Sequence, residues 1–527
     1  MLERPYPRAL SKRRSVSTAP ASTAVRLARD TPAPLLLVAA DRTLVEQLAT
    51  WVRQRINEGL FRAGSRVPSI RRLAAERGIS RFTVVEAYER LVAGGYLESR
   101  RGSGFYVRDP ATRRSNRRDA KRAERSTVPA STDASRVDAR WLVQNMFRQM
   151  PAQQMPGSGL PPPEWMDGDL LASGLRAVGR RGGVGFLDYG TPQGYLPLRS
   201  QLQWKLAGAE IAADPAQIVL TSGATQAFDL IARHFIVPGD TVLVDDPAWF
   251  LMFGLFAAHG ARVIGVPRLA DGPDLATLER LAAQHKPRFY VVDSVLHNPT
   301  STSLSAAKAF QILKLADAHD FIVVEDDVYG DLHPGSAGGR GLPATRMASL
   351  DQLNRVIHVG SFSKTLAANL RVGFIACAAD LAPELAEHKM LAALTTPEVG
   401  ERIVHRVLVE GHYRKHVERL RGRFDSVRDR AVRGLERAGL VVENPPAAGM
   451  FLWAGAHEAH GRKGDGSGRG IDTTVLAARM FDLGFLLAPG GLFSPSQLPN
   501  DRLRFNIATS SNPQMLDALA RTIQDMA

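Results

Sequence analysis

The sequence predicts an α/β protein in two parts, a small basic module near the N-terminus and a large domain built on a mainly parallel sheet. The 527 residues exceed what one hydrophobic core ordinarily holds, so two or more domains are expected. From Trp141 onward, short apolar runs alternate with helical patterns, which is typical of parallel strands joined by helices. The clearest runs are Ile218–Leu220, Thr241–Val244, Phe289–Val292, Phe321–Val324 and Val356–Val359.

The charge distribution separates the same two parts. Residues 1–140 carry 29 Lys and Arg against 14 Asp and Glu, whereas residues 141–527 carry 38 against 39. The whole of the net charge of +14 therefore lies in the first quarter of the chain. Such asymmetry predicts a nucleic-acid-binding portion joined to a neutral one, and a solvated basic tail is the alternative.

Composition divides the chain further. Residues 1–40 are rich in Arg, Ser, Thr, Ala and Pro and predict a disordered basic tail, residues 41–107 predict a compact module, residues 108–140 predict a flexible basic linker, and residues 141–527 form the large domain. The chain has one cysteine, Cys377, which excludes an internal disulfide framework. No run of about 18 apolar residues occurs, so we expect no membrane span and a cytoplasmic location.

The basic module predicts three helices and a hairpin. One amphipathic helix is expected over residues 44–58, because Leu44, Leu48, Val52 and Ile56 recur every four positions. Two further helices are expected over residues 70–77 and 81–93, capped by Ser69 and Ser80. Residues 96–98 and 104–107 predict two short strands around a basic turn. Three helices followed by a basic hairpin predict a winged helix-turn-helix.

This module has side chains suited to DNA. Arg81 and Thr83 lie at the N-terminal end of the third helix, where a helix inserted in the major groove meets base edges. Arg71, Arg100 and Arg101 are expected to reach phosphates. Residues 65–107, SRVPSIRRLAAERGISRFTVVEAYERLVAGGYLESRRGSGFYV, resemble the GntR-type DNA-binding domain, which implies double-stranded promoter or operator DNA as partner. A winged helix used only for protein contacts remains the alternative.

In the large domain the most informative segment is Gly360–Leu366, GSFSKTL, which directly follows an apolar run. A lysine at the end of a buried strand, here Lys364, loses its proton readily and can attack an aldehyde. Ser361, Ser363 and Arg371 supply hydrogen-bond donors and charge for a phosphate.

Other segments supply partners for this lysine. Ala224 and Thr225 open a helix after a strand and a Gly-containing turn, an arrangement that binds phosphate. Trp249 can stack on a pyridine ring, and the Asn298 amide can donate to a phenolic oxygen. A buried carboxylate such as Asp326 keeps a ring nitrogen protonated, because the opposite charge favours the ionised form.

Together these motifs resemble fold type I pyridoxal-phosphate-dependent aminotransferases over roughly residues 150–527. The resemblance implies that Lys364 binds pyridoxal 5'-phosphate as an aldimine and that Asp326 pairs with the ring nitrogen. The catalytic residues implied are Lys364, Asp326 and Tyr329. The remaining cofactor contacts implied are Asn298 and Tyr329 to the ring 3-oxygen, Trp249 stacked on the ring, and Ala224, Thr225, Ser361, Ser363 and Arg371 around the phosphate.

The resemblance also implies two residues outside that set. Tyr189 matches the tyrosine that reaches the phosphate of the neighbouring subunit, which implies a homodimer. Arg504, in the apolar stretch Leu503–Phe505, would bind the α-carboxylate of a ligand. No metal site is expected, because the pair His412 and His416 alone supplies too few ligands for one.

A GntR-type module in front of such a domain is typical of the MocR subfamily of GntR regulators. The resemblance implies a transcription regulator that senses an amino acid or an amine through its cofactor. The alternative is an aminotransferase, for example one acting on an amino-dicarboxylic acid, with an attached DNA-binding module. Whether the protein is an enzyme is left open, since weak transamination can accompany regulation.

Overall fold

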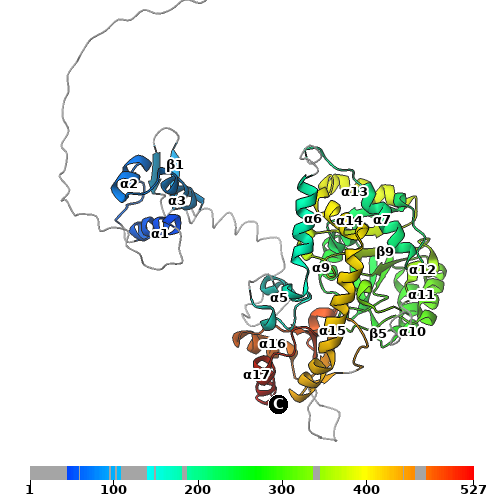
Figure 1. Cartoon of the computed structure of the whole chain (residues 1–527). Coiled ribbons are helices and arrows are strands. Elements are labelled where there is room, and N and C mark those ends of the chain that lie inside the picture. The colour runs from blue at the N-terminus through cyan, green and yellow to red at the C-terminus, as the bar shows by residue number, and fades with distance from the viewer. Residues whose placement is uncertain are drawn as a thin grey trace, which may run out of the picture. The chain divides into compact units, whose positions relative to one another are not determined.

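The computed structural model describes residues 44–57, 60–93, 96–100, 104–107, 139–146, 150–180, 187–335, 345–442, 444–456 and 471–526. The chain divides into two compact units, Met1–Thr132 and Asp133–Ala527, both of which are drawn in Figure 1. The division falls within the predicted linker of residues 108–140. The predicted tail, residues 1–40, and most of that linker lie outside the described residues.

The small unit is a winged helix-turn-helix. Its elements are α1 (Leu44–Asn57), α2 (Ile70–Arg77), α3 (Arg81–Ala93), β1 (Leu97–Arg100) and β2 (Gly104–Val107), and the two strands pair antiparallel. The Ser69 hydroxyl accepts a hydrogen bond from Arg72 N at 3.3 Å, and the Ser80 hydroxyl accepts one from Thr83 N at 3.0 Å, so both predicted caps are present. The bounds of α2 and α3 are those predicted, whereas the first strand begins one residue later and extends to Arg100.

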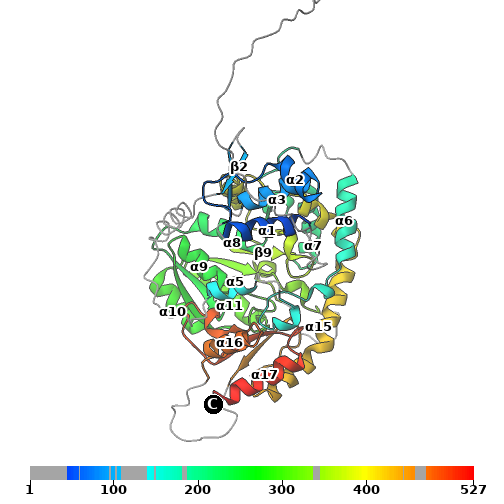
Figure 2. The same ribbon diagram turned by 90° about the vertical axis from the view of Figure 1, so that its left-hand side faces the viewer.

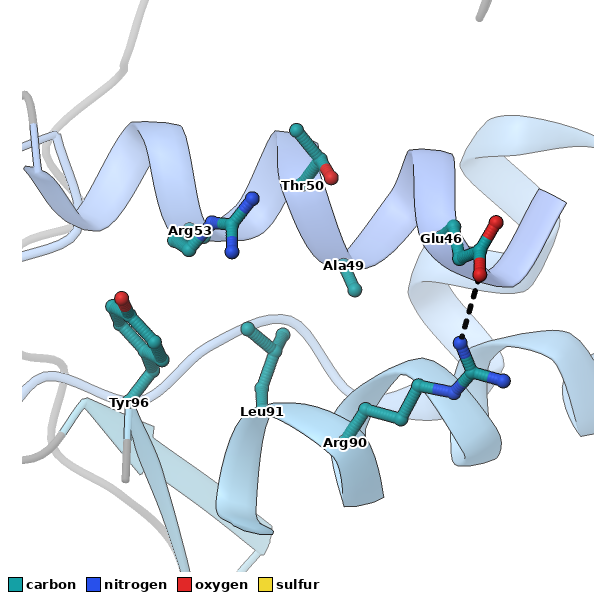
Figure 3. A pocket seen from close by; sticks show the side chains of 7 residues that line it. All are labelled: Glu46, Ala49, Thr50, Arg53, Arg90, Leu91 and Tyr96. Atoms are coloured by element: carbon teal, nitrogen blue, oxygen red, sulfur yellow. Dashed lines mark ion pairs between the residues drawn. The ribbon is translucent and has the colours of Figure 1, made fainter. Parts of the chain in front are cut away.

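Helices α1 and α3 of the small unit pack against each other through apolar side chains. Leu48 and Val52 of α1 and Tyr88 and Leu91 of α3 are buried in one cluster. Beside that core, Figure 3 shows a groove between the two helices, lined by Glu46, Ala49, Thr50, Arg53, Arg90, Leu91 and Tyr96. The ion pair drawn across it, with 3.5 Å between Arg90 Nη1 and Glu46 Oε1, is half exposed and adds little stability to the packing.

The large unit contains a sheet of eight strands in the order β3-β10-β9-β8-β7-β4-β5-β6. Strands β3, β9, β8, β7, β4 and β5 run in one direction, while β10 is antiparallel to both of its neighbours and β6 is antiparallel to β5. The mainly parallel sheet predicted from the sequence is confirmed. The bounds are β3 (Ile218–Thr221), β4 (Thr241–Asp246), β5 (Arg262–Leu269), β6 (Gly272–Pro273), β7 (Phe289–Val292), β8 (Ile322–Asp326), β9 (Val356–Ser361) and β10 (Gly373–Ala376).

Helices cover both faces of this sheet because successive strand residues point to opposite sides. On β4, Leu243 joins the core under α7, α10, α11, α12 and α14, whereas Val242 and Val244 join the core under α8, α9 and α13. Figure 1 shows α10, α11 and α12 side by side along one flank. The helix bounds are α5 (Ala139–Met146), α6 (Gly168–Arg180), α7 (Leu196–Ala207), α8 (Ala224–Phe235), α9 (Leu251–Ala258), α10 (Leu275–His285), α11 (Ala306–Ala318), α12 (Met347–Asp351), α13 (Leu381–Ala393) and α14 (Glu398–Val409).

The C-terminal part of the large unit forms a second, antiparallel sheet in the order β11-β12-β14-β13. Its elements are α15 (His412–Arg437), β11 (Val441–Val442), β12 (Phe451–Gly455), α16 (Thr473–Asp482), β13 (Ala488–Pro489), β14 (Arg502–Asn506) and α17 (Pro513–Gln524). Figure 2 shows α16 and α17 at the end of the large unit that is farthest from α7. Among the described residues, no helix has the length and apolar character needed to cross a membrane.

Candidate functional site

One pocket of the large unit lies where five parallel strands end. It is lined by Ala224, Thr225, Trp249, Asn298, Asp326, Val328, Tyr329, Ser361, Ser363, Lys364 and Arg371. These residues belong to β8 and β9 or follow β3, β4, β7, β8 and β9, and the carboxyl ends of parallel strands meet at one edge of a sheet. All of them except Val328 are residues that the sequence predicts at a cofactor site.

Lys364 and Asp326 give this pocket a base and an acid. Burial, together with the positive charges of Arg504 and Arg371, lowers the pKa of the Lys364 amine to about 8. Asp326 is the last residue of β8, and its Oδ1 accepts a hydrogen bond from Val328 N at 3.1 Å. Burial raises the pKa of Asp326 to about 7. The pocket therefore holds an amine that is easily deprotonated and a carboxyl that ionises fully only beside a positive charge.

Hydrogen-bond donors gather at the N-terminal end of α8. Gly223, which precedes the helix, has φ of +78°, and a Cβ built on it would lie 2.6 Å from Arg371 Nη2. Arg371 itself has φ of +51°, an uncommon conformation for a residue other than glycine. Its Nη2 donates to Ser222 O at 2.7 Å and its Nη1 donates to Ser363 Oγ at 3.3 Å. A helix N-terminus, an arginine and a serine pair thus form a cradle for a phosphate.

Arg504 lies on β14 and reaches the same site through Asn298. Its Nη1 donates to Asn298 Oδ1 at 2.9 Å and its Nη2 donates to Gly157 O at 2.7 Å. The guanidinium carbon stands 4.5 Å from the centre of the Phe451 ring and 4.8 Å from that of Phe493. Burial lowers the pKa of Arg504 to about 10, and its Nε has no hydrogen-bond partner. An anion at this position would compensate a buried charge that the described residues leave without a carboxylate.

A loop before α6 lies against the site, and the sequence reasoning missed it. A Cβ at Gly159 would lie 3.6 Å from Arg504 Nη2 and 3.8 Å from Lys364 Nζ. Asn506 fixes the loop, since its Nδ2 donates to Ser158 O at 3.1 Å and to Leu160 O at 2.7 Å. The two glycines in the stretch PGSGLPPP are a signal for close backbone approach, but they do not reveal the partner.

Asp293 is a second residue beside the site that the sequence reasoning did not identify. It follows β7, it is buried, and its Oδ2 accepts a hydrogen bond from Asn298 N at 3.0 Å. Burial, together with the negative charge of Asp326, raises the pKa of Asp293 well above its ordinary value. The only sign in the sequence that Asp293 supports Asn298 is its position immediately after a valine-rich strand. Asp293 holds the backbone of Asn298 while Arg504 holds its side chain.

Tyr189 does not reach the pocket of its own chain. Its side chain is 82% exposed, as is that of Leu187 two residues before it. The segment is anchored six residues farther on, where Tyr195 N donates to Glu401 Oε2 at 2.8 Å. An exposed tyrosine next to an exposed leucine on an ordered segment is compatible with a role in a neighbouring subunit.

The predicted DNA contacts are only partly described. Arg71 on α2 and Arg81 on α3 are exposed, and Thr83 is half-buried. The Thr83 hydroxyl lies 2.8 Å from the Ser80 hydroxyl, within hydrogen-bond distance. Arg100 ends β1, but its side chain and the whole of Arg101 lie outside the described residues.

Comparisons with known proteins match both units. The family profile "Aminotransferase class I and II" matches residues 165–523, and the profile "Bacterial regulatory proteins, gntR family" matches residues 44–107. A 2-aminoadipate transaminase of Thermus thermophilus is 30% identical, with 69% of this chain and 87% of that protein covered. The HTH-type transcriptional regulator TauR of Rhodobacter capsulatus is 28% identical over 92% of this chain and 97% of its own length. A probable rhizopine catabolism regulatory protein MocR of Rhizobium meliloti is 27% identical over 72% of this chain and 75% of that protein.

Solved structures match the large unit. The kynurenine aminotransferase of Pyrococcus horikoshii superposes with a TM-score of 0.65 at 26% identity, covering 76% of this chain and 98% of that one. The α-aminoadipate aminotransferase LysN of Thermus thermophilus superposes with a TM-score of 0.64 at 25% identity, covering 73% of this chain and 95% of that one. That LysN structure contains a phosphopyridoxyl-leucine ligand.

The residues of the pocket fit pyridoxal 5'-phosphate, the cofactor of this enzyme family. The cradle around Gly223 supplies backbone and side-chain donors for a phosphate, and Lys364 supplies an amine of lowered pKa for an aldehyde. Asp326 supplies the buried carboxyl that a protonated ring nitrogen requires. The chain therefore belongs to the aminotransferase class I and II family and carries a gntR-type DNA-binding domain in front of its pyridoxal-phosphate-binding domain, the combination of the MocR-type transcription regulators.

Proposed function

We propose that the protein is a transcription regulator whose binding to promoter DNA responds to an amino acid or an amine at the Lys364 pocket. The observation that carries this proposal is the gathering of ten of the eleven predicted cofactor residues around one pocket, in the same chain as a DNA-binding unit. A ligand controls a distant site only through unequal affinity for two arrangements of the protein. An amine captured by the cofactor would change the charge and the contacts of the pocket residues, and that change would supply the inequality.

Each pocket residue has a specific role in this proposal. Bound pyridoxal 5'-phosphate supplies an aldehyde that captures amines and a ring that withdraws electrons. Lys364 would attach it covalently, and Asp326 would keep its ring nitrogen protonated. The amide of Asn298 and the hydroxyl of Tyr329 would donate to its 3-oxygen, and burial raises the pKa of Tyr329, which keeps that hydroxyl protonated. Trp249 would stack on the ring, and Ala224, Thr225, Ser361, Ser363 and Arg371 would hold the phosphate.

Arg504 defines the class of effector. Its guanidinium is buried, and among the described residues its hydrogen bonds go to two neutral oxygens, Asn298 Oδ1 and Gly157 O. A carboxylate binds such a group in a bidentate manner and removes the cost of the unpaired charge. We therefore infer that the effector carries a carboxylate near its amine, as an α-amino acid does.

On the DNA side, we propose that α3 enters the major groove with Arg81 and Thr83 near base edges. Arg71, Arg100 and Arg101 would contact phosphates on either side. Exposed arginines on α2 and α3 support this placement. A regulator of this kind works where the chromosome is, so we propose a cytoplasmic location.

We further propose that the functional form is a homodimer in which Tyr189 completes the phosphate site of the partner subunit. The exposure of Tyr189, and its absence from the pocket of its own chain, support this assignment.

The test is a DNA-binding titration with the full chain loaded with pyridoxal 5'-phosphate. Fluorescence anisotropy on a duplex from its own promoter region should give an affinity that falls steeply with salt and changes when the matching amino acid is added. Lys364→Ala should bind DNA in the absence of amino acid but lose the response, together with the visible absorbance of the attached cofactor. No affinity for promoter DNA, or an unchanged response in Lys364→Ala, would refute the proposal.

A second function, transamination, is supported by the same pocket and by the 30% identity to a 2-aminoadipate transaminase. Regulation is the better supported of the two, because a DNA-binding unit has no part in transamination. Rapid turnover of a common amino acid that depends on a keto acid, with DNA affinity unaffected by that amino acid, would favour the enzyme.

A further inference from the structure

Phe82, the second residue of α3, places an aromatic side chain in solvent. It is 75% exposed, more than either of the other exposed large apolar residues described in the small unit, Leu44 at 53% and Leu60 at 61%. A large apolar side chain left in water forgoes the stabilisation that burial gives. Single exposed apolar residues are common on protein surfaces, so position decides whether this one has a role.

The position of Phe82 is at the end of α3 that meets base edges in a groove-inserted helix. The buried face of α3 is formed by Val84, Ala87, Tyr88 and Leu91. With 3.6 residues per turn, Phe82 points about 200° around the helix from Val84, directly away from this core. Its neighbour Arg81 is exposed as well. The two side chains therefore form the exposed tip of the helix.

The third residue of the tip is less available. The Thr83 backbone N–H donates to the Ser80 hydroxyl at 3.0 Å, and the two hydroxyls lie 2.8 Å apart. Capping of the helix thus engages one hydrogen-bonding position of the Thr83 hydroxyl within the protein. The two exposed side chains of this tip are the cation of Arg81 and the apolar ring of Phe82.

We propose that Phe82 reads thymine by contact with its 5-methyl group in the major groove. Among the four bases, thymine presents a methyl group there, and phenylalanine is one of the side chains that contact it. Arg81 would then read a guanine or a phosphate beside that thymine. This role rests on the proposed insertion of α3 into the major groove.

The test begins with selection from a random duplex library by the full chain loaded with pyridoxal 5'-phosphate. Wild-type protein should select a motif with at least one fixed thymine. Replacement of that thymine by deoxyuracil removes only the methyl group and should weaken binding about fourfold, the effect of burying one such group. Phe82→Ala should bind the two duplexes equally, and Phe82→Leu should retain part of the difference.

Leu60→Ala is the matched control, because it removes an exposed apolar side chain of the same unit outside α3. It should keep the fourfold preference, and thermal melting should show that none of these variants unfolds the unit. If Phe82→Ala selects the same motif and still binds the deoxyuracil duplex fourfold more weakly, the role of Phe82 is refuted. The refutation is most direct if Arg81→Ala abolishes selection, because base reading would then depend on Arg81 and not on Phe82. Failure of the wild-type chain to select any motif would instead refute DNA reading by α3, and with it the proposed function.

Discussion

Among single residues, burial gives the Lys364 amine the lowered pKa that it needs to react with the aldehyde of the cofactor. A neutral amine attacks an aldehyde, and with a pKa of about 8 half of the Lys364 amines are neutral at that pH. The rate at which the apo-protein acquires the visible absorbance of bound pyridoxal 5'-phosphate should rise with pH and level off above about pH 8. Rapid mixing across pH 6 to 10 measures it. A rate that still climbs tenfold per pH unit above pH 9 would indicate an ordinary lysine.

Lys389 provides an internal control for this measurement. Its pKa is also lowered to about 8 by burial, but its amine donates to Leu220 O at 2.7 Å and to Thr396 Oγ1 at 3.0 Å. Lys364→Arg should therefore give no absorbance at any pH, because a lowered pKa without access to the pocket does not capture the cofactor. Absorbance that persists in Lys364→Arg and disappears in Lys389→Met would reassign the attachment site.

Asp293 supports the backbone of Asn298 from inside the core. Burial and the charge of Asp326 raise the pKa of Asp293 well above its ordinary value, which favours the protonated carboxyl, a group that resembles an amide in shape and charge. Asp293→Asn should be nearly neutral, whereas Asp293→Ala leaves the buried Asn298 N–H without its acceptor and should cost about 1–3 kcal/mol of stability. Urea unfolding measures both variants. Equal losses in the two would mean that Asp293 is needed in its charged form.

The residues that sequence reasoning found and those that it missed differ in how local their signals are. Lys364, Ser361 and Ser363 fall within a seven-residue segment after an apolar run, so the pattern alone brings them together. Asn506 and Ser158 are separated by 348 positions, and nothing in either segment points to the other. Residues that orient a site through such long-range contacts can be identified only from the folded structure, in which the two sheets bring them together.

At the scale of elements, Glu325 ties three of them together inside the large unit. Its Oε2 lies 2.9 Å from His358 Nδ1 on β9, and its two oxygens accept hydrogen bonds from Met347 N at 2.5 Å and Ala348 N at 3.2 Å in α12. Burial acts to raise the pKa of Glu325, but the hydrogen bonds and the charge of His358 outweigh it and lower the pKa below 4.5. An amide in place of the carboxylate keeps one acceptor oxygen and loses the negative charge, so at least one of these buried partners would be left without its acceptor.

Glu325→Gln should therefore cost about 3–5 kcal/mol of the free energy of unfolding at pH 7, the range for breaking a buried pair. Because the folded pKa is lowered, the stabilisation is fully present above about pH 4.5 and is lost as the pH falls through the folded value. Urea unfolding of both proteins at pH 7 and at decreasing pH should show their difference shrink. The exposed ion pair of Asp320 with Arg355, 3.0 Å long, is the control, and Asp320→Asn should cost less than about 1 kcal/mol.

Most elements that position the site could be predicted from the sequence because their signals are periodic and short. The apolar runs predicted for β3, β4, β7, β8 and β9 all form strands, and several continue one or two residues into the site, as β8 does to Asp326. The antiparallel direction of β10 could not be predicted, since direction depends on which neighbours a strand meets. The short strands β11 and β13 have two residues each and carry no periodicity at all.

At the scale of the whole molecule, charge and fold are divided between the two units. The N-terminal 140 residues hold an excess of 15 positive charges (29 minus 14), and the rest of the chain is nearly neutral (38 minus 39). DNA affinity should therefore reside mainly in the first part, while ligand chemistry resides in a unit whose net charge is close to zero. In the proposed homodimer, a ligand bound to the large unit would then affect DNA binding by the small unit through the way in which two large units pair. Regulation is therefore best tested on the dimer.

The dimer predicts complementation between two defective chains. A hybrid of Tyr189→Ala with Lys364→Ala contains one site built from the intact lysine of the first chain and the intact tyrosine of the second. Purified through two different affinity tags, it should bind pyridoxal 5'-phosphate covalently at one site per dimer with wild-type affinity. The Tyr189→Ala homodimer should bind it weakly, and the Lys364→Ala homodimer should form no covalent bond. Absorbance titration measures all three. A hybrid as weak as the Tyr189→Ala homodimer would show that Tyr189 serves its own chain or none, and that each pocket is complete within one subunit.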